Sequence, residues 1–382
     1  MPDLIFSIPH ETIFGIDVIN RLGNVAARFG ERVLVVTEAI LYERQTIERI
    51  TTLLEKKNIS YIVYDEVVPN ATSATVDEAL LLARGSHAEV VVGMGGVCAL
   101  SIAKAVAMAA KCKNDFDDFM SGTKPEKPPL AYIEIPTTCR NPFMYTDEYL
   151  VVDARDRSGR ICTAQEGITK SILIDPKLSL SLPSKYTATT MVDTFLSAFE
   201  GIISAKSNFL ADSLFYKAIE MLVQNINQAL KDPEDVKMRV DAASAGMLTG
   251  LGLSMSKQGI GSALAYALNS KLMVPKSWLA TILFPSVIEF SINTSSEKIA
   301  PIARLLGEET EGVSSIDASK KAVEALRRLI GTLQLPPRLR DFDLNLDDMM
   351  DITSVARSFD MMNYLSRMAS DEELLEIIKQ AY

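Results

Sequence analysis

The hydrophobic positions in the first half of the chain indicate strands that alternate with helices. Short apolar runs, typical of buried strands, occur at 32–38, 61–67, 89–92, 130–136 and 171–175. Helical stretches separate the first three runs, at about 43–57 and 73–84. Strands separated by helices of about ten to fifteen residues are typical of βαβ units. This half of the chain therefore predicts an α/β domain with a parallel sheet.

A hairpin is predicted within this half. Two strand-like segments, 149–154 and 160–164, flank the polar run Arg155-Asp156-Arg157-Ser158-Gly159. A short polar run that ends in glycine between two apolar segments is typical of a turn between antiparallel strands.

After Pro183 the apolar positions change to a helical period. Phe195, Phe199 and Ile202 follow each other at three- to four-residue spacing. The segments with this pattern are 208–231, 234–254, 260–271, 276–293 and 313–333. Ser370 and Glu373 have the spacing of a capping box, which predicts a last helix up to the carboxyl end. We therefore predict an α/β domain over 1–183 and an all-helical domain over 184–382.

Composition and charge exclude some classes of function. The chain has 48% hydrophobic and 23% charged residues, as in folded globular proteins, and its net charge is -10. Nucleic acid binding is disfavoured because the phosphate groups of nucleic acids bind basic patches, whereas this chain is acidic overall. The apolar segment 278–292 contains Pro285 and Glu289 and is too short to span a bilayer. The first residues lack the features of a signal peptide, so we expect a cytoplasmic protein without membrane contact.

Cysteine and histidine offer few metal ligands. Cys98, Cys112, Cys139 and Cys162 show no CxxC spacing, so we expect free thiols. An alternative is a reactive Cys98 at a helix amino terminus, with Cys139 on a neighbouring loop as its partner. His10 and His87 are the only histidines. Since histidine is the usual ligand of iron and zinc, this scarcity limits the metal sites that the chain can build.

Short motifs in a fixed order carry a family resemblance. They are Phe14-Gly15, Val36-Thr37, Val68-Pro69-Asn70-Ala71-Thr72, Gly93-Met94-Gly95-Gly96, Ala103-Lys104, Ile135-Pro136-Thr137-Thr138, Ile174-Asp175-Pro176, Leu180-Ser181-Leu182-Pro183, Asp193, Ala263-Leu264-Ala265, Pro275 and Ala381-Tyr382. Their order and spacing resemble the iron-containing alcohol dehydrogenases, relatives of glycerol dehydrogenase and dehydroquinate synthase. The resemblance spans nearly the whole chain. It implies a dehydroquinate synthase-like fold with a Rossmann-like first domain, and a homodimer, since members commonly self-associate.

The resemblance also implies four metal ligands, of which this chain keeps one. Family members hold a divalent ion with an aspartate, a histidine four residues later on the same helix, and two histidines on later helices. The corresponding residues here are Asp193, Ser197, Ser262 and Lys276. Serine hydroxyls are poor ligands for iron or zinc, and a protonated lysine cannot act as a ligand. We therefore expect no Fe²⁺ or Zn²⁺ at this place.

Lys276 is the predicted replacement for the metal ion. A buried Asp193 without its cation would be costly, so we predict an ion pair between Asp193 and Lys276. In the alternative, Lys276 faces solvent and Asp193 caps a helix or binds water. A further alternative is Mg²⁺ held by Asp193 and Glu200. Glu200 lies roughly two helical turns further on, a long reach for one ion.

The first cofactor loop of the family, GGGSxxDxAK, also differs here. The family loop wraps the pyrophosphate of a dinucleotide with glycines and a helix amino terminus. Val97, Cys98 and Ser101 replace its third glycine, its serine and its aspartate. If the backbone at position 97 required a positive φ, valine would be strained and the loop would change shape. We favour a ligand-free strand-to-helix turn; the alternative is residual binding by Gly93, Gly95, Gly96 and Lys104, together with Thr137 and Thr138.

The second cofactor loop, TTAGTGSE in the family, has become Thr137-Thr138-Cys139-Arg140-Asn141-Pro142-Phe143-Met144. Both glycines are lost. We expect Phe143 and Met144 to fill the space that a cofactor ring needs; in the alternative, the loop folds outward around Pro142. Arg140 is interpreted as a surface arginine, although a guanidinium in a cleft could bind phosphate or carboxylate.

Together these changes favour a family member that has lost metal-dependent hydride transfer. That reaction needs a metal to polarise the oxygen and a nicotinamide beside it. We expect a binding, regulatory or structural-assembly protein without a cofactor. One alternative is a divergent NAD(P)-dependent alcohol or aldehyde oxidoreductase that uses Lys276 as electrophile or acid. Another is a binding module for a phosphorylated metabolite, with Arg140 and the helix after Gly96 as its anion site. The sequence leaves open whether the chain is an enzyme.

Overall fold

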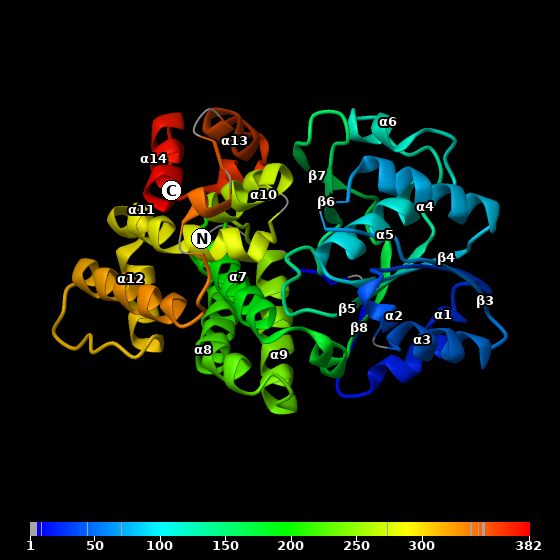
Figure 1. Ribbon diagram of the computed structural model, residues 1–382, viewed down its shortest axis with the longest axis horizontal. Helices are drawn as coiled ribbons and strands as arrows, with labels where there is room; N and C mark the ends of the chain where they lie inside the picture. Colours follow the sequence, from blue (N-terminus) through cyan, green and yellow to red (C-terminus); the bar gives the residue numbers. More distant parts are fainter. Residues whose placement is uncertain are drawn as a thin grey trace. The chain divides into compact units, whose positions relative to one another are not determined.

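The computed structural model describes residues 6–8, 10–43, 45–69, 71–272, 274–336, 338–342, 344–345 and 348–382. The chain forms two compact units, Ser7–Ser181 and Leu182–Tyr382, and Phe6 groups with the second (Figure 1). The division between Ser181 and Leu182 lies two residues before the boundary that the change of hydrophobic period predicts.

The first unit contains a parallel sheet with strand order β1-β8-β5-β4-β2-β3. Its strands are β1 Glu11–Phe14, β2 Arg32–Val36, β3 Ser60–Tyr64, β4 Val90–Gly95, β5 Ala131–Pro136 and β8 Thr169–Ile174. Each adjacent pair is parallel, which confirms the predicted sheet. The hydrophobic pattern does not reveal β1, because this edge strand has no fully buried residue.

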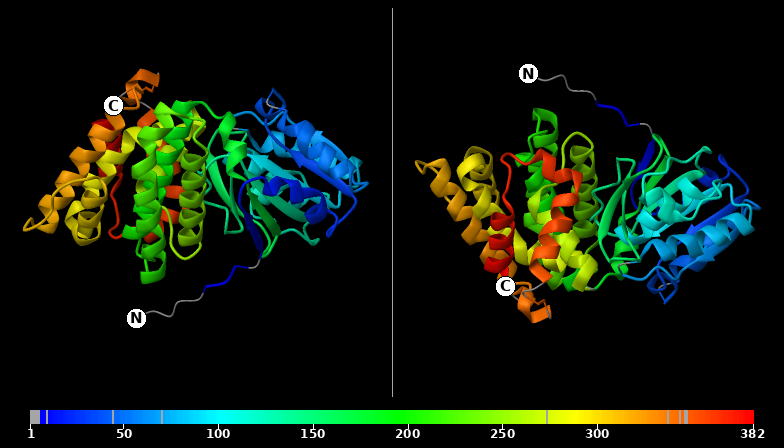
Figure 2. Two further views of the ribbon diagram at one scale, coloured as in Figure 1. Left: turned by 90° about the horizontal axis from the view of Figure 1, so that it is seen from below. Right: turned by 90° about the horizontal axis from the view of Figure 1, so that it is seen from above.

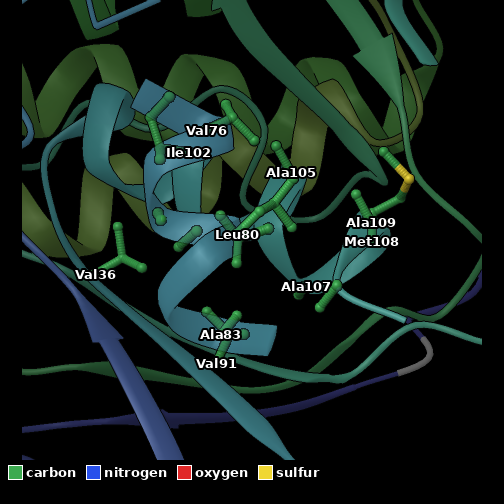
Figure 3. Close-up of a cluster of buried hydrophobic side chains, with 14 of the residues drawn as sticks. Val36, Val76, Leu80, Ala83, Val91, Ile102, Ala105, Ala107, Met108 and Ala109 are labelled. Atoms are coloured by element: carbon green, nitrogen blue, oxygen red, sulfur yellow. The ribbon is translucent and has the colours of Figure 1, made fainter. Parts of the chain in front are cut away.

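Helices cover both faces of this sheet. They are α1 Leu22–Ala26, α2 Ile40–Glu43, α3 Thr46–Glu55, α4 Ser73–Gly85, α5 Val97–Ala109 and α6 Phe116–Met120, with 3-10 turns at Val18–Arg21 and Pro176–Ser181. In β2, Val33 and Val35 pack into one hydrophobic cluster with α1 and α3. Leu34 and Val36 pack into the other cluster, with α4 and α5 (Figure 3). Because both faces are covered, the central strands are continuously apolar.

The predicted hairpin is confirmed. Strands β6 Glu148–Val152 and β7 Gly159–Thr163 form an antiparallel pair outside the main sheet.

The described part of the second unit is helical, as predicted. Its helices are α7 Ser184–Ile203, α8 Phe209–Lys231, α9 Val236–Leu253, α10 Ile260–Leu272, α11 Lys276–Leu305, α12 Ser315–Gly331, α13 Asp348–Ser358 and α14 Asp371–Ala381, with 3-10 turns at Leu339–Phe342 and Asp360–Tyr364. Figure 2 shows α7, α8 and α9 side by side. The capping box of α14 is confirmed: the Glu373 amide donates to Ser370 Oγ at 3.2 Å, and the Ser370 amide donates to the Glu373 carboxylate at 2.8 Å.

Helix α11 is longer than its hydrophobic pattern predicts. The predicted end at 293 is wrong, because the helix continues to Leu305 through a break at Ser295, where φ is -136° and ψ is 19°. Ile299 and Ile302 beyond the break are fully buried, so packing sustains the second segment. Among the described residues, no helix is both long and apolar enough to cross a membrane.

Candidate functional site

Four positions on three helices meet inside the helical unit. Asp193 and Ser197 lie one turn apart on α7, which places both on one face of that helix. Ser262 lies on α10, and Lys276 is the first residue of α11. All four are buried, and Lys276 is the most exposed at 5%. These are the positions at which the resemblance implies a metal ion.

An ion pair joins two of these residues. The Lys276 ammonium donates to Asp193 Oδ1, and the Nζ atom lies 4.7 Å from the centre of the Tyr266 ring. The predicted pair is therefore present in the structure. The alternative with a solvent-facing Lys276 is wrong because the side chain is buried, and Asp193 lies within α7 rather than at its end.

The side-chain amide of Gln258 connects the two serines. Its Nε2 donates to Ser197 Oγ and to Ser262 Oγ, each at 2.9 Å. Its Oε1 accepts from the Tyr266 hydroxyl at 3.4 Å. Sequence reasoning missed Gln258, which precedes α10 and lies outside the helical period. The one available signal was its position four residues before Ser262, within reach of the same site.

The residues present do not fit iron or zinc. Serine hydroxyls are weak ligands, and those of Ser197 and Ser262 are already bonded to Gln258. Across the part of the chain that the structure describes, no group of three or more His, Cys, Asp or Glu side chains could hold a metal ion. Mg²⁺ shared by Asp193 and Glu200 is not supported either. Glu200 Oε1 accepts from the amides of Gly261 at 2.6 Å and Ser262 at 3.0 Å, so this oxygen caps α10.

The glycine turn after β4 binds a carboxylate of the same unit. Gly95 has φ 147°, which favours glycine, and Gly96 precedes α5. The Gly96 amide donates to Glu38 Oε1 at 3.1 Å. A helix amino terminus attracts anions, and here the Gly96 amide at the start of α5 already donates to a carboxylate of the chain itself. Burial raises the pKa of Glu38. Sequence reasoning missed this residue. An acidic residue after a strand of the sheet is a recognisable signal in dinucleotide-binding folds, where it binds a ribose hydroxyl.

Val97 fits its place without backbone strain. It begins α5 and is not among the described non-glycine residues with positive φ, so the condition for strain is not met. Its side chain is 6% exposed. The retained Gly93 has a packing role, since a Cβ at this position would lie 2.7 Å from the Ala103 Cβ. This glycine lets α5 pack closely on β4.

The retained Lys104 bonds to the backbone of its own unit. Its ammonium donates to the carbonyls of Phe143 at 3.1 Å, Thr146 at 2.9 Å and Glu148 at 3.2 Å. The residue is 1% exposed. Lys104 thereby ties α5 to the end of the second cofactor loop and to the segment that follows it.

Other polar groups of the two loops also bond within the unit. The Thr137 amide donates to the Gly95 carbonyl at 3.0 Å, and Thr138 Oγ1 donates to the Arg140 carbonyl at 3.1 Å. Ser101 Oγ accepts from the Leu150 amide at 3.1 Å. These contacts fix the loop backbones without a ligand.

The second cofactor loop is buried. Phe143 is 5% and Met144 2% exposed, so the alternative of a loop folded outward is wrong. The Asn141 amide donates to Glu134 Oε1, and its Oδ1 accepts from the Phe143 amide at 3.2 Å. Arg140 is half-buried rather than fully on the surface. None of the four cysteines forms a disulfide, as expected.

Glu134 makes the stability of the protein depend on pH. Burial raises its pKa from 4.5 to about 7, although Lys104 Nζ lies 4.0 Å from Glu134 Oε2 and acts in the opposite direction. The folded state therefore holds a proton that the unfolded state releases. The free energy of unfolding should fall by up to about 3 kcal/mol as pH rises from about 4.5 to about 7.

Urea unfolding across this pH window measures the effect. Glu134→Gln should flatten the slope, whereas Glu126→Gln, which changes an exposed carboxylate, should leave it unchanged. Stability that rises across this window in the wild type, relative to Glu134→Gln, would contradict a raised pKa.

Two family models together match most of the chain. The model described as iron-containing alcohol dehydrogenase matches residues 9–176, and the model for the C-terminal part of the Fe-containing alcohol dehydrogenase family matches 187–382. The chain belongs to the iron-containing alcohol dehydrogenase family. The resemblance inferred from its ordered motifs is thereby confirmed.

Known members of the iron-containing alcohol dehydrogenase family cover this chain almost end to end. The 1,3-propanediol dehydrogenase of Citrobacter freundii is 25% identical over 99% of this chain and 98% of its own length. The lactaldehyde reductase of Escherichia coli K12 is 27% identical over 97% of each chain. A crystal structure of 1,3-propanediol oxidoreductase has a TM-score of 0.93 at 24% identity and covers 100% of both chains. The fold of the family is therefore retained throughout.

Proposed function

We propose that this member of the iron-containing alcohol dehydrogenase family has lost metal-dependent hydride transfer and serves as a binding, regulatory or structural-assembly protein. The ion pair between Lys276 and Asp193 carries the proposal. In the family reaction, a divalent ion at this place would polarise the substrate oxygen. Here the positive charge belongs to a side chain that is already hydrogen-bonded to Asp193. A homodimer in the cytoplasm is part of this proposal.

The cofactor loops support the same proposal. Glu38 accepts the hydrogen bond of Gly96 that a pyrophosphate would need. Val97 adds a side chain where close approach of the backbone to phosphate requires glycine. Phe143 and Met144 are buried side chains in a loop that has lost both family glycines. We therefore propose that the protein functions without NAD(P).

A divergent oxidoreductase is the second candidate. The observation that favours it is the glycine turn, where Gly95 keeps a positive φ. Relatives include an NAD-dependent methanol dehydrogenase of Bacillus methanolicus. Such an enzyme would act on a small alcohol or aldehyde, with Lys276 as its acid. The half-buried Arg140 favours the third candidate, a binding module for a phosphorylated metabolite at the same turn.

Ligand titration tests these candidates directly. The purified chain would be titrated with NADH and NADPH, with and without Fe²⁺ or Zn²⁺, and assayed for 1,3-propanediol oxidation and lactaldehyde reduction. We expect neither micromolar binding nor turnover. Micromolar dinucleotide binding would contradict the loss of the cofactor, and turnover with it would favour the oxidoreductase. A stoichiometric transition metal would contradict the assignment of the ligand positions.

Substitution of Glu38 tests the blocked glycine turn. Glu38→Ala should free the Gly96 amide and remove a negative charge beside it. We expect the affinity for ADP, which carries a pyrophosphate, to rise about tenfold, equivalent to about 1.4 kcal/mol, as measured by calorimetry. Glu66→Ala, which removes an exposed carboxylate on the neighbouring segment, is the matched control. Equal ADP affinity of the Glu38 variant and the wild type would show that Glu38 does not block the turn.

A further inference from the structure

Strand β3 is an edge strand whose outer side is open. It is the last strand of the main sheet, and within the described part of the chain β2 is the one strand that pairs with it (Figure 1). The Ser60 amide and the Tyr64 carbonyl bond to the backbone at the two ends of β2, at 2.8 Å and 2.9 Å. Because the backbone groups of successive residues alternate in direction, those of Tyr61 and Val63 point to the open edge.

This edge lacks the features that usually prevent the addition of another strand. Charged residues, proline and β-bulges are the common ones. Strand β3 has the sequence Ser-Tyr-Ile-Val-Tyr, and its register with β2 is unbroken over its 5 residues. The other edge strand, β1, carries Glu11, which pairs with Arg28 at 2.7 Å. Of the two edges, β3 is therefore the one that favours pairing with a further strand.

Exposed leucines of α4 extend this edge into an apolar patch. The Tyr64 hydroxyl donates to the Glu78 carboxylate on α4 at 2.8 Å, so the helix lies beside the strand. Because α4 connects two parallel strands, it runs opposite to them, and the turn after Glu78 comes alongside Ile62. Ile62 is 37%, Leu81 69% and Leu82 37% exposed. Large apolar side chains grouped on a surface are typical of protein–protein contacts.

The sequence of β3 fits a second copy of itself in the antiparallel direction. When Ile62 of two copies lie opposite each other, Tyr61 of each copy lies opposite Val63 of the other. The outward amides and carbonyls of each such pair can then exchange two hydrogen bonds, and an aromatic side chain packs well beside a β-branched one. A shift by one residue would set these outward groups against groups already bonded to β2, so the register about Ile62 is favoured.

The charges that flank β3 match in the same arrangement. Lys56 and Lys57 precede the strand, and Asp65 and Glu66 follow it. An antiparallel pair brings the basic end of one copy to the acidic end of the other, at both ends of the contact. In a parallel pair, like charges would meet. Charge therefore favours the antiparallel direction, which is also the direction that a two-fold axis produces.

We propose that two copies of this chain associate through β3, which pairs antiparallel with β3 of the second copy about Ile62, while Leu81 and Leu82 flank the contact on one face of the joined sheet. The inference rests on the homodimer that is part of the proposed function, and it is independent of the loss of hydride transfer.

Sedimentation equilibrium of the full chain tests the contact. Ile62→Lys sets two like charges opposite each other at its centre, so the Kd of the dimer should rise by about tenfold or more. Ile316→Lys, which changes an isoleucine of α12 that is 46% exposed, should leave the Kd unchanged. A wild type that stays monomeric would overturn both the homodimer and this surface. A dimer that Ile62→Lys does not weaken would overturn the surface alone, as would a dimer that is weakened only by Ile16→Lys, beside β1.

A disulfide between the two copies tests the register. Residues opposite each other in a non-hydrogen-bonded antiparallel pair have Cα atoms about 4.5 Å apart, within the range of a disulfide. Ile62→Cys should therefore form a cross-linked dimer with oxidised glutathione as the oxidant, and Ile316→Cys should not. The wild type, with its own four cysteines, gives the background. Cross-linking of Ile62→Cys no faster than this background would overturn the proposal, even if Ile62→Lys does not fold.

Discussion

Lys276→Met should lower the free energy of unfolding by about 3–5 kcal/mol, because it removes the ammonium that compensates the buried Asp193 carboxylate. Methionine has a similar length and no charge, so most of the loss should come from the charge and not from packing. Denaturant unfolding measures the effect. The matched control is Lys271→Met, which changes an exposed lysine on α10 and should shift stability by less than about 0.5 kcal/mol.

The double variant Asp193→Asn/Lys276→Met separates the contribution of the ion pair from the cost of a single unpaired charge. Neither buried charge remains in it, so it should recover much of the stability that either single variant loses. The coupling energy between the two positions should therefore be large. Additive effects of the two substitutions would show that the side chains do not interact as the structure indicates.

Introducing histidine at three positions should turn the ion pair back into a metal site. The triple variant Ser197→His/Ser262→His/Lys276→His keeps Asp193 and supplies three imidazoles on the helices that carry these positions. We expect one equivalent of Co²⁺ or Zn²⁺ to bind with a Kd of about 1 μM or lower, equivalent to about -8 kcal/mol or better. Co²⁺ provides an absorption band that reports its coordination, and the wild type should show no such band.

A fourth substitution provides the control for this experiment. Asp193→Asn added to the triple variant should weaken metal binding by one to two orders of magnitude or more, since it removes the only charged ligand. A triple variant that folds but binds no metal would show that the backbone no longer holds these positions at metal-binding distances.

The fold was predictable because buried positions place hydrophobic residues in a regular pattern along the sequence. The continuous apolar runs of β2 and β4 reflect a sheet that is covered on both faces. In the helical unit, hydrophobic residues recur at the three- to four-residue spacing of a helix. Strand β1 was not predicted, because this edge strand buries little hydrophobic surface. The second part of α11 was not predicted because the polar residues around Ser295 and the later Pro301 are typical of a helix end, whereas packing of Ile299 and Ile302 prolongs the helix.

At the candidate site, the sequence allowed a prediction only where a metal ligand of the family was replaced by another residue. Asp193 and Lys276 could be paired in advance because a buried carboxylate needs a cation. The contact of Glu38 with Gly96 and that of Gln258 with Ser197 join residues that lie far apart in sequence, so no local pattern specifies them. Lys104 shows a further limit. Its presence in a cofactor motif did not reveal that its ammonium is directed at three backbone carbonyls.

The pair between Lys276 and Asp193 also changes how this unit assembles. A metal centre must be loaded from the surroundings, so its occupancy depends on metal supply, on competing proteins and on chelators. Here the cation is encoded in the chain and arrives with the first residue of α11. It is present once in every molecule, wherever and whenever that molecule folds. Docking of α11 on α7 therefore delivers the counter-charge in the same step that forms the core.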